Sequence, residues 1–318
     1  MILSGATDPL GERVLARLRA AGNTVVTVPD ATLTRLDPDP DLKGTLAGAD
    51  AAVHLLGDLD ATRALLDAAG SAGVTHVVAL SSATVYGAWP GNPVPLTEAA
   101  TVRPNPGLDL AVRAAERERL VAEWAFDHPG STAAVLRPAT PVTEAELGWL
   151  AEGLAVSAMI RSVAEDDPPA QFVDLDDLAD AIVLAATERL DGAFNVAPDG
   201  WIAGDQLRAL AGGPRLRVPA PVAGVVAGLR RWLGPVSAHP GLAPYTVHPW
   251  VVANDRLRAA GWVPGSSNEE AFVAAHKPAP WATISPQRRQ ELALGAVGVV
   301  AAGLGLGAVA LIRRRRRR

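Results

Sequence analysis

The chain contains no cysteine, which excludes disulfide bonds and any reaction that depends on a thiolate. Tyrosine and lysine are almost as rare: the tyrosines are Tyr86 and Tyr245, and the lysines are Lys43 and Lys277. Charged residues make up only 20% of the chain, whereas hydrophobic residues make up 49%. A chain of 318 residues with this composition can bury a substantial core and is not intrinsically disordered.

The net charge of −5 conceals an uneven distribution. Arginines occupy positions 288, 289 and 313–318, so the remainder of the chain is clearly acidic. This acidity argues against nucleic acid as a partner of the globular part. The first thirty residues lack a basic stretch followed by an apolar one, so we expect no signal peptide and a cytoplasmic body.

No residue pattern indicates a metal site. The six histidines show no spacing with carboxylates that is typical of metal ligands. The acidic run Asp174–Asp177 is better explained as negative charge at the start of a helix. We therefore expect no metal.

Residues 292–312 form an uncharged, apolar run. At about 1.5 Å per residue, a helix of this length spans roughly 31 Å, the thickness of the hydrocarbon core of a bilayer. A buried helix of a soluble domain is the alternative, but an uncharged run flanked by arginines is more typical of a membrane helix. We expect a single C-terminal anchor in the cell membrane, preceded by a linker at 277–291. A poly-arginine tail at 313–318 would contact membrane lipids.

Residues 1–189 alternate short apolar runs with helical patterns. Strands are expected at 1–6, 24–28, 51–56, 75–82 and 132–138, and helices at 11–22, 61–73 and 108–128. Apolar strands separated by helices indicate a parallel sheet that is covered on both faces. The sequence therefore predicts a doubly wound α/β fold with its ligands at the carboxyl ends of the strands.

From about residue 190 the pattern loosens, and proline and glycine become frequent. Helical patterns remain at 204–212, 221–234 and 252–262. They predict a smaller, irregular C-terminal lobe over residues 190–276, of the kind that holds a substrate.

Five stretches carry a more specific signal because they occur together and in order: AGADAAVHLLG, LLDAAGSAGVTHVVALSSATVYG, VLRPATPV, FVDLDDLADAIVLA and GAFNVA. In this order they resemble the extended short-chain dehydrogenase/reductase family, specifically its NAD-dependent epimerase/dehydratase branch. The resemblance covers roughly residues 1–200. It implies a Rossmann-like domain that binds NAD or NADP.

The resemblance also implies which residues would contact the dinucleotide. They are Gly5, Thr7, Gly11, Asp30, Leu55, Ser81, Arg137 and Pro138. Asp30 stands for the acidic residue that holds the adenine ribose, although the family's spacing from Gly22 would place that residue at Pro29.

The glycine turn, SGATDPLG, contains some residues that favour dinucleotide binding and others that oppose it. Asp8 and Pro9 stand where a second glycine normally makes room for the pyrophosphate. Asp8 is a good N-cap, and its carboxylate would occupy the anion site of the helix and repel phosphate. The glycines favour dinucleotide binding and Asp8 opposes it, so the sequence leaves this question open.

The family's reaction, as the resemblance implies, uses a tyrosine with a lysine four residues later for proton transfer. In this chain Pro90 follows Tyr86 by four residues, and Pro249 follows Tyr245 by four. No alignment produces the pair.

The helix that should carry the pair has other residues in its place. Leu110 and Ala114 occupy the two positions when Glu118 sets the register, and a shift by two gives Leu108 and Val112 instead.

Two residues remain as catalytic candidates. Ser82 stands at the position of the family's serine, but a hydroxyl at a strand end also commonly caps local backbone. Asp109 lies on the relevant helix, but it would also form a surface ion pair with Arg113.

Two functions of different classes fit these observations. The first is a membrane-tethered, non-catalytic or atypical NAD(P)-binding or sensing module, which the absent pair favours. The second is an NAD(P)-dependent oxidoreductase or epimerase that acts on a sugar or lipid-linked substrate with an atypical acid such as Asp109. A scaffold that recruits partners to the membrane is a third interpretation, and homo-oligomerisation is open in each.

Overall fold

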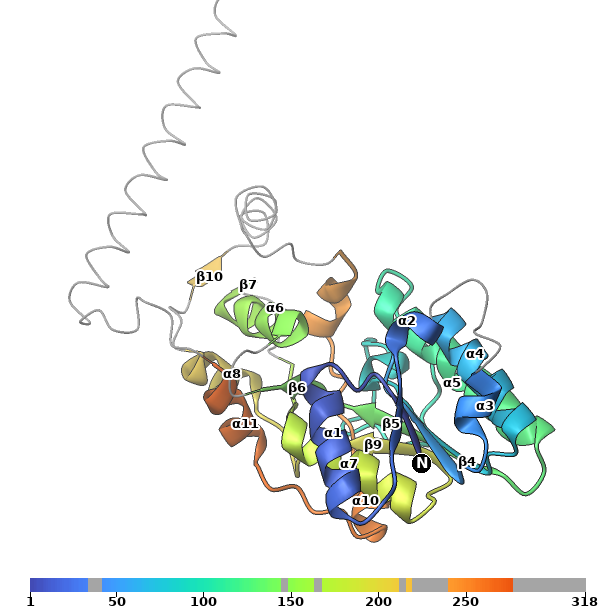
Figure 1. Cartoon of the computed structure of the whole chain (residues 1–318). Helices are drawn as coiled ribbons and strands as arrows, with labels where there is room; N and C mark the ends of the chain where they lie inside the picture. The colour runs from blue at the N-terminus through green and yellow to red at the C-terminus, as the bar shows by residue number, and fades with distance from the viewer. Residues whose placement is uncertain (34–41, 144–147, 163–167, 212–215, 219–239, 277–318) are drawn as a thin grey trace, which may run out of the picture. The chain divides into compact units, whose positions relative to one another are not determined.

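The structure is a computed structural model that describes residues 1–33, 42–143, 148–162, 168–211, 216–218 and 240–276 (Figure 1). The chain divides into a compact unit of residues 1–276 and a second unit, Lys277–Arg318, which lies outside the described residues. The predicted linker, anchor and arginine tail all fall in this second part, and the predicted helix 221–234 also lies outside the described residues. Within the described ranges, no helix is both long and apolar enough to cross a bilayer.

Six short strands form a parallel sheet in the order β2-β1-β3-β4-β5-β9. They are β1 (Ile2–Ser4), β2 (Val26–Val28), β3 (Ala51–His54), β4 (His76–Leu80), β5 (Thr132–Pro138) and β9 (Gly192–Val196). Ile2 pairs with Val26 on one side and with Ala52 on the other, which fixes β1 between β2 and β3. The predicted parallel, Rossmann-like sheet is confirmed.

Helices cover both faces of this sheet (Figure 1). On one face lie α1 (Pro9–Ala20) and α7 (Leu175–Thr187), and on the other lie α3 (Leu42–Leu46), α4 (Leu59–Ala72) and α5 (Asp109–Asp127). Neighbouring residues of one strand point to opposite faces, so Val77 packs in the cluster under α4 and α5, whereas Val78 packs in the cluster under α1 and α7. This double burial explains why the strands are apolar throughout.

The strand order reverses at β1, because β2 lies on one side of β1 and all later strands of the sheet lie on the other. The loops that follow β1 and β3 therefore face each other at the carboxyl edge, which is the usual ligand position in such sheets. They approach closely: a Cβ added to Gly5 would lie 2.9 Å from the Cβ of Leu55. Gly5 also has φ +78°, a conformation that favours glycine.

Smaller elements follow β5 and pack over the remaining core. They are the pairs β6 (Thr140–Val142) with β8 (Phe172–Asp174) and β7 (Ile160–Ser162) with β10 (Leu216–Val218), the helices α6 (Gly148–Met159), α8 (Gly204–Leu210), α10 (Asp255–Ala259) and α11 (Asn268–Ala275), and the short helix η2 (Pro240–Thr246). Buried residues of β6, α6, α8, α11 and η2 form one cluster with η1 (Ala83–Tyr86) and with the first half of α5, whereas Leu257 of α10 packs in the cluster under α1 and α7. β9 lies beyond residue 189, where the sequence pattern suggested that the lobe begins.

A carboxylate of α7 accepts hydrogen bonds from the backbone of the C-terminal part. Asp177 is buried, its Oδ1 accepts a hydrogen bond from the amide of Gly265 at 2.6 Å, and its Oδ2 accepts one from the amide of Ser266 at 3.0 Å. Asp174 caps the same helix by accepting from the amide of Asp176 at 2.7 Å. The predicted role of this acidic run, negative charge at a helix start, is confirmed.

Candidate functional site

The glycine turn after β1 leads directly into α1, and Asp8 is the N-cap of that helix. Its Oδ1 accepts a hydrogen bond from the amide of Gly11 at 2.6 Å, and Pro9 occupies the first helical turn. The predicted cap is confirmed. The N-terminus of α1, which is the natural anion site of this fold, therefore already holds a carboxylate from the chain itself.

Asp30, at the start of the short helix α2 (Asp30–Leu33), faces the same turn. Its Oδ1 accepts from the amide of Gly5 at 3.1 Å, and its Oδ2 accepts from the hydroxyl of Thr7 at 3.2 Å. The structure thus brings together three of the residues that the resemblance assigned to a dinucleotide. A carboxylate at the end of the second strand is also placed to accept hydrogen bonds from ribose hydroxyls.

The loop after β3 forms the opposite wall of this region. The amide of Leu55 donates to the carbonyl of Ser4 at 3.2 Å, and the side chain of Leu55 contacts Gly5. Leu55 is therefore placed beside the glycine turn.

Buried hydrogen bonds made by His54 of β3 connect this region to β1 and to α4. His54 lies 2.7 Å (Nδ1) from the hydroxyl of Ser4 and 2.9 Å (Nε2) from the hydroxyl of Thr62. Thr62 donates its own proton to the carbonyl of Asp58 at 2.7 Å, so it accepts from Nε2–H, and in the neutral ring Nδ1 accepts from the hydroxyl of Ser4. Burial, together with the nearby Arg117 cation, lowers the pKa of His54 to about 3.

Ser81 and Arg137 are brought together by Glu118 of α5. The guanidinium of Arg137 donates from Nε to Oε1 of Glu118 at 3.0 Å and from Nη2 to Oε2 at 2.6 Å, and Ser81 donates to Oε1 at 2.5 Å. The two charged side chains are only 8% and 10% exposed. Burial alone would lower the pKa of Arg137, but Glu118 raises it above the usual value. Pro138, the neighbouring candidate, ends β5 and is buried in register with Val196.

Both tyrosines are buried, and both hydroxyls have internal partners. Tyr86 donates to the amide oxygen of Asn195 at 2.8 Å and accepts from Nη1 of Arg137 at 2.7 Å. Tyr245 donates to the carbonyl of Thr84 at 2.8 Å. Burial raises the pKa of Tyr86 and raises that of Tyr245 to about 12, so neither phenol is prepared to lose a proton near neutral pH.

The two catalytic candidates occupy different surroundings. Ser82 Oγ caps η1, where it accepts from the amide of Thr84 at 3.2 Å and from the hydroxyl of Thr84 at 2.9 Å. Asp109 begins α5 and is exposed. In the described part of the chain no ion pair joins Asp109 to Arg113, so the expected surface pair is absent. Leu110 is 43% exposed on the same turn.

Sequence reasoning missed Arg117, which is only 9% exposed. It lies on the buried stripe of α5 that also contains Ala114 and Val121, and it donates from Nη1 to the carbonyl of Gly57 at 2.7 Å. An arginine at an apolar helix position was the signal that could have revealed it.

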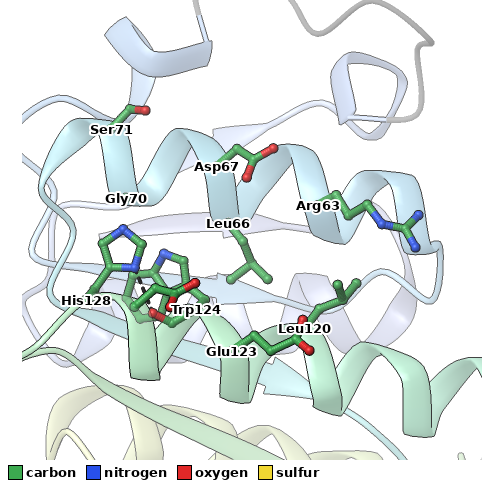
Figure 2. A pocket seen from close by; sticks show the side chains of 10 residues that line it. Arg63, Leu66, Asp67, Gly70, Ser71, Leu120, Glu123, Trp124 and His128 are labelled. Atoms are coloured by element: carbon green, nitrogen blue, oxygen red, sulfur yellow. Dashed lines mark hydrogen bonds between the residues drawn. The ribbon is translucent and has the colours of Figure 1, made fainter.

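A groove of about 600 Å³ lies between α4 and α5 (Figure 2). Its lining includes Asp67 and Ser71 from α4 and Glu123, Trp124 and Asp127 from α5. His128, at the end of α5, leans against Gly70 (Figure 2) and stacks on Trp124 with ring centroids 5.0 Å apart. None of the candidate residues lines this groove, so it is separate from the site at the carboxyl edge.

Residues 48–197 match the profile of the NAD dependent epimerase/dehydratase family. No curated protein matches the sequence.

Solved structures share the fold over most of the chain. UDP-glucose 4-epimerase from Thermus thermophilus, in complex with NAD, has 17% identity and a TM-score of 0.61, covering 86% of this chain and 96% of its own. UDP-N-acetylglucosamine 4-epimerase from Bacillus cereus has 15% identity and a TM-score of 0.61, covering 86% and 97%. A short-chain dehydrogenase/reductase superfamily protein from Agrobacterium tumefaciens, with bound NAD, has 20% identity and a TM-score of 0.63, covering 93% and 98%.

At these identities the similarity to solved structures establishes the fold. The family match adds information on the segment 48–197. The chain is thus an α/β protein with the Rossmann-like fold of short-chain dehydrogenases/reductases, and its residues 48–197 carry the pattern of the NAD dependent epimerase/dehydratase family.

Proposed function

We propose that this chain is an epimerase/dehydratase-like protein that binds or senses NAD without catalysing the family's proton transfer. We propose further that residues 292–312 tether it to the cell membrane, with the globular body in the cytoplasm. The family match and the contacts of Asp30 with the glycine turn support dinucleotide binding.

One observation carries the non-catalytic part of the proposal. The sequence holds two tyrosines, and the hydroxyls of both are buried and hydrogen-bonded to Asn195 or to the carbonyl of Thr84. A phenol that acts as acid or base must reach the substrate and must have a pKa near the working pH. Neither hydroxyl meets these conditions, because burial raises the pKa of both groups.

The position of Asp30 favours NAD over NADP. Its carboxylate contacts Gly5 and Thr7 at the end of β2, where the adenine ribose lies in this fold. A carboxylate there accepts hydrogen bonds from the ribose hydroxyls of NAD and repels the additional phosphate of NADP.

An NAD-dependent epimerase or oxidoreductase is the second candidate function. The similarity to two UDP-sugar 4-epimerases favours a nucleotide sugar as its substrate, and a membrane tether would suit a lipid-linked sugar. Ser82, at the end of the β4 region, would orient the substrate oxygen, and Asp109 would be the atypical acid.

Calorimetric titration of the full chain with NAD⁺, NADH, NADP⁺ and NADPH tests the first function, in parallel with turnover assays on UDP-glucose and UDP-N-acetylglucosamine. We expect binding of NAD forms without turnover. Turnover that disappears in Ser82→Ala, but persists in a control Ser71→Ala on the exposed face of α4, would replace the first function with the second. No binding of any dinucleotide would contradict both.

A further inference from the structure

Two buried arginines lie close to the carboxyl edge of the sheet, and their surroundings differ sharply. Arg137 forms a bidentate ion pair with Glu118, which compensates its charge. Arg117, the residue before Glu118, has no carboxylate within ion-pairing distance among the described residues, although it is only 9% exposed. A buried charge without a partner is strongly unfavourable, so Arg117 requires an explanation.

The hydrogen bonds of Arg117 do not supply the missing compensation. A guanidinium has five N–H donors, but among the described residues Arg117 makes one hydrogen bond, from Nη1 to the neutral carbonyl of Gly57 at 2.7 Å. Its Nε is buried and has no partner in that part of the chain. Burial lowers the pKa of Arg117 below its usual value, and the more distant Glu118 and Asp58 only partly oppose this effect.

The position of Arg117 points to the ligand region. Side chains on a helix lean toward its N-terminus, and α5 begins beside η1 at the carboxyl edge of the sheet. The guanidinium therefore reaches Gly57 in the loop after β3, two residues beyond Leu55, which contacts Gly5 of the glycine turn.

Gly57 has no side chain that could cover this guanidinium. The position where a Cβ would stand lies 3.8 Å from Nη1 of Arg117, at van der Waals distance. At the N-terminus of α1, by contrast, the carboxylate of Asp8 already accepts a hydrogen bond from the amide of Gly11. An anionic ligand that enters between the loops after β1 and β3 thus meets a negative group on α1 and an uncompensated positive group behind Gly57.

We propose that Arg117 binds a phosphate group of the ligand and replaces the N-terminus of α1 as the phosphate anchor of this fold. A guanidinium suits this role because its planar donors match two phosphate oxygens at once. The inference rests on the proposed nucleotide binding, and it adds the residue that binds the negatively charged phosphate. The phosphate can belong to a dinucleotide or to a nucleotide sugar, and the choice of titrant separates these sources.

The test compares Arg117→Met, which removes the charge at similar length, with Arg117→Lys, which keeps it, in the full chain. Arg119→Met is the matched control, because Arg119 lies on the exposed face of the same helix and pairs with Glu123. Each protein is titrated with NAD⁺, ADP-ribose, UDP-glucose, adenosine and pyrophosphate, and its thermal midpoint is measured without ligand.

We expect Arg117→Met to weaken the binding of NAD⁺ and ADP-ribose at least tenfold and to abolish pyrophosphate binding. Adenosine affinity should stay constant, Arg117→Lys should lose less than threefold, and Arg119→Met should behave as wild type. The thermal midpoint of Arg117→Met should be unchanged or higher, because an uncompensated buried charge is removed. Preferential loss of UDP-glucose binding would instead identify the nucleotide sugar as the source of the phosphate.

A structural role would produce a different pattern. If Arg117 only holds the Gly57 loop in place, Arg117→Met lowers the thermal midpoint and weakens adenosine and NAD⁺ equally, which would overturn the inference. Unchanged NAD⁺ binding in Arg117→Met would overturn it while the proposed function stands. If wild type binds no nucleotide but binds pyrophosphate through Arg117, the proposed function fails and the anchor remains. No binding of any titrant overturns both.

Discussion

The carboxylate of Asp8 lies 2.6 Å from the amide of Gly11, so the first turn of α1 is closed by a negative group from its own chain. The same glycine is held against the turn from the other side, because a Cβ on Gly11 would lie 1.9 Å from the carbonyl oxygen of Gly5. Position 11 therefore has no room for a side chain, and an incoming phosphate would meet the Asp8 carboxylate.

Replacing Asp8 with glycine should strengthen dinucleotide binding. The change removes a like charge and clears backbone for the pyrophosphate, which we expect to improve affinity about five- to thirty-fold, or about 1–2 kcal/mol. Loss of the cap should cost no more than about 1 kcal/mol of unfolding free energy. Calorimetry with NAD⁺ and thermal unfolding measure the two effects, which have opposite signs.

Asp8→Asn is the matched control for this prediction, because asparagine caps a helix about as well as aspartate but carries no charge. It should improve affinity without loss of stability. Low-micromolar NAD⁺ binding by wild type that weakens in both variants would contradict our interpretation. Asp8 would then support the ligand, and the oxidoreductase function would become the stronger candidate.

Acid should destabilise the protein through its buried neutral histidine His54. Its pKa is about 3 in the folded protein, below the ordinary value of 6.5, so the unfolded chain binds the proton first. The contribution to stability is complete above about pH 6.5 and is lost as the pH falls toward about 3. Between pH 6.5 and 5 we expect a loss of about 2 kcal/mol from this group.

Urea unfolding at a series of pH values measures this loss. His54→Gln should be less stable at pH 7 but should show a flatter decline with acid. Equal slopes in wild type and His54→Gln would show that the acid sensitivity has another source. His76, which is also buried and whose pKa burial lowers, would be the next group to test.

The Glu118–Arg137 pair should contribute strongly to the stability of the fold. Glu118→Gln leaves the guanidinium of Arg137 buried without its countercharge, and removing one partner of a buried pair typically costs about 3–5 kcal/mol. The double variant Glu118→Leu/Arg137→Met should recover most of this loss. Denaturant midpoints of the three proteins measure the effect, and a Glu118→Gln protein as stable as wild type would refute it.

Deletion of residues 290–318 should move the protein from the membrane fraction to the supernatant, because it removes the apolar run 292–312 and the arginine tail 313–318. A shorter deletion of residues 313–318 alone separates the electrostatic contribution of the arginines from that of the apolar run. Continued membrane association of the longer deletion would exclude the proposed anchor.

Local patterns in the sequence were sufficient to predict most elements of the sheet and its helices. The helix expected at 108–128 is α5, and the glycine at Gly22 ends the first helix with φ +82° as its position indicates. The strand expected at 75–82 stops at Leu80, because Ser82 caps a short helix instead of continuing the strand. Periodicity and capping depend on neighbouring residues, so a single sequence reveals them.

Long-range pairing could not be predicted in this way. The sequence makes both Ser81 and Arg137 candidates, but nothing in it indicates that Glu118 joins them. Arg117 was missed because its partner, the carbonyl of Gly57, is 60 residues away. Contacts of this kind depend on how α5 packs against the sheet.

The carboxylate of Asp177 has a consequence for the order in which this protein is made. Its partners, the amides of Gly265 and Ser266, follow it by 88 and 89 residues. A ribosome that adds about 5–20 residues per second needs roughly 4–18 s to synthesise that interval. During this time α7 carries a carboxylate that must stay hydrated, so the face of α7 that it shares with Trp262 cannot close. Completion of the sheet's core, which includes Trp262, therefore awaits the synthesis of residues 262–266.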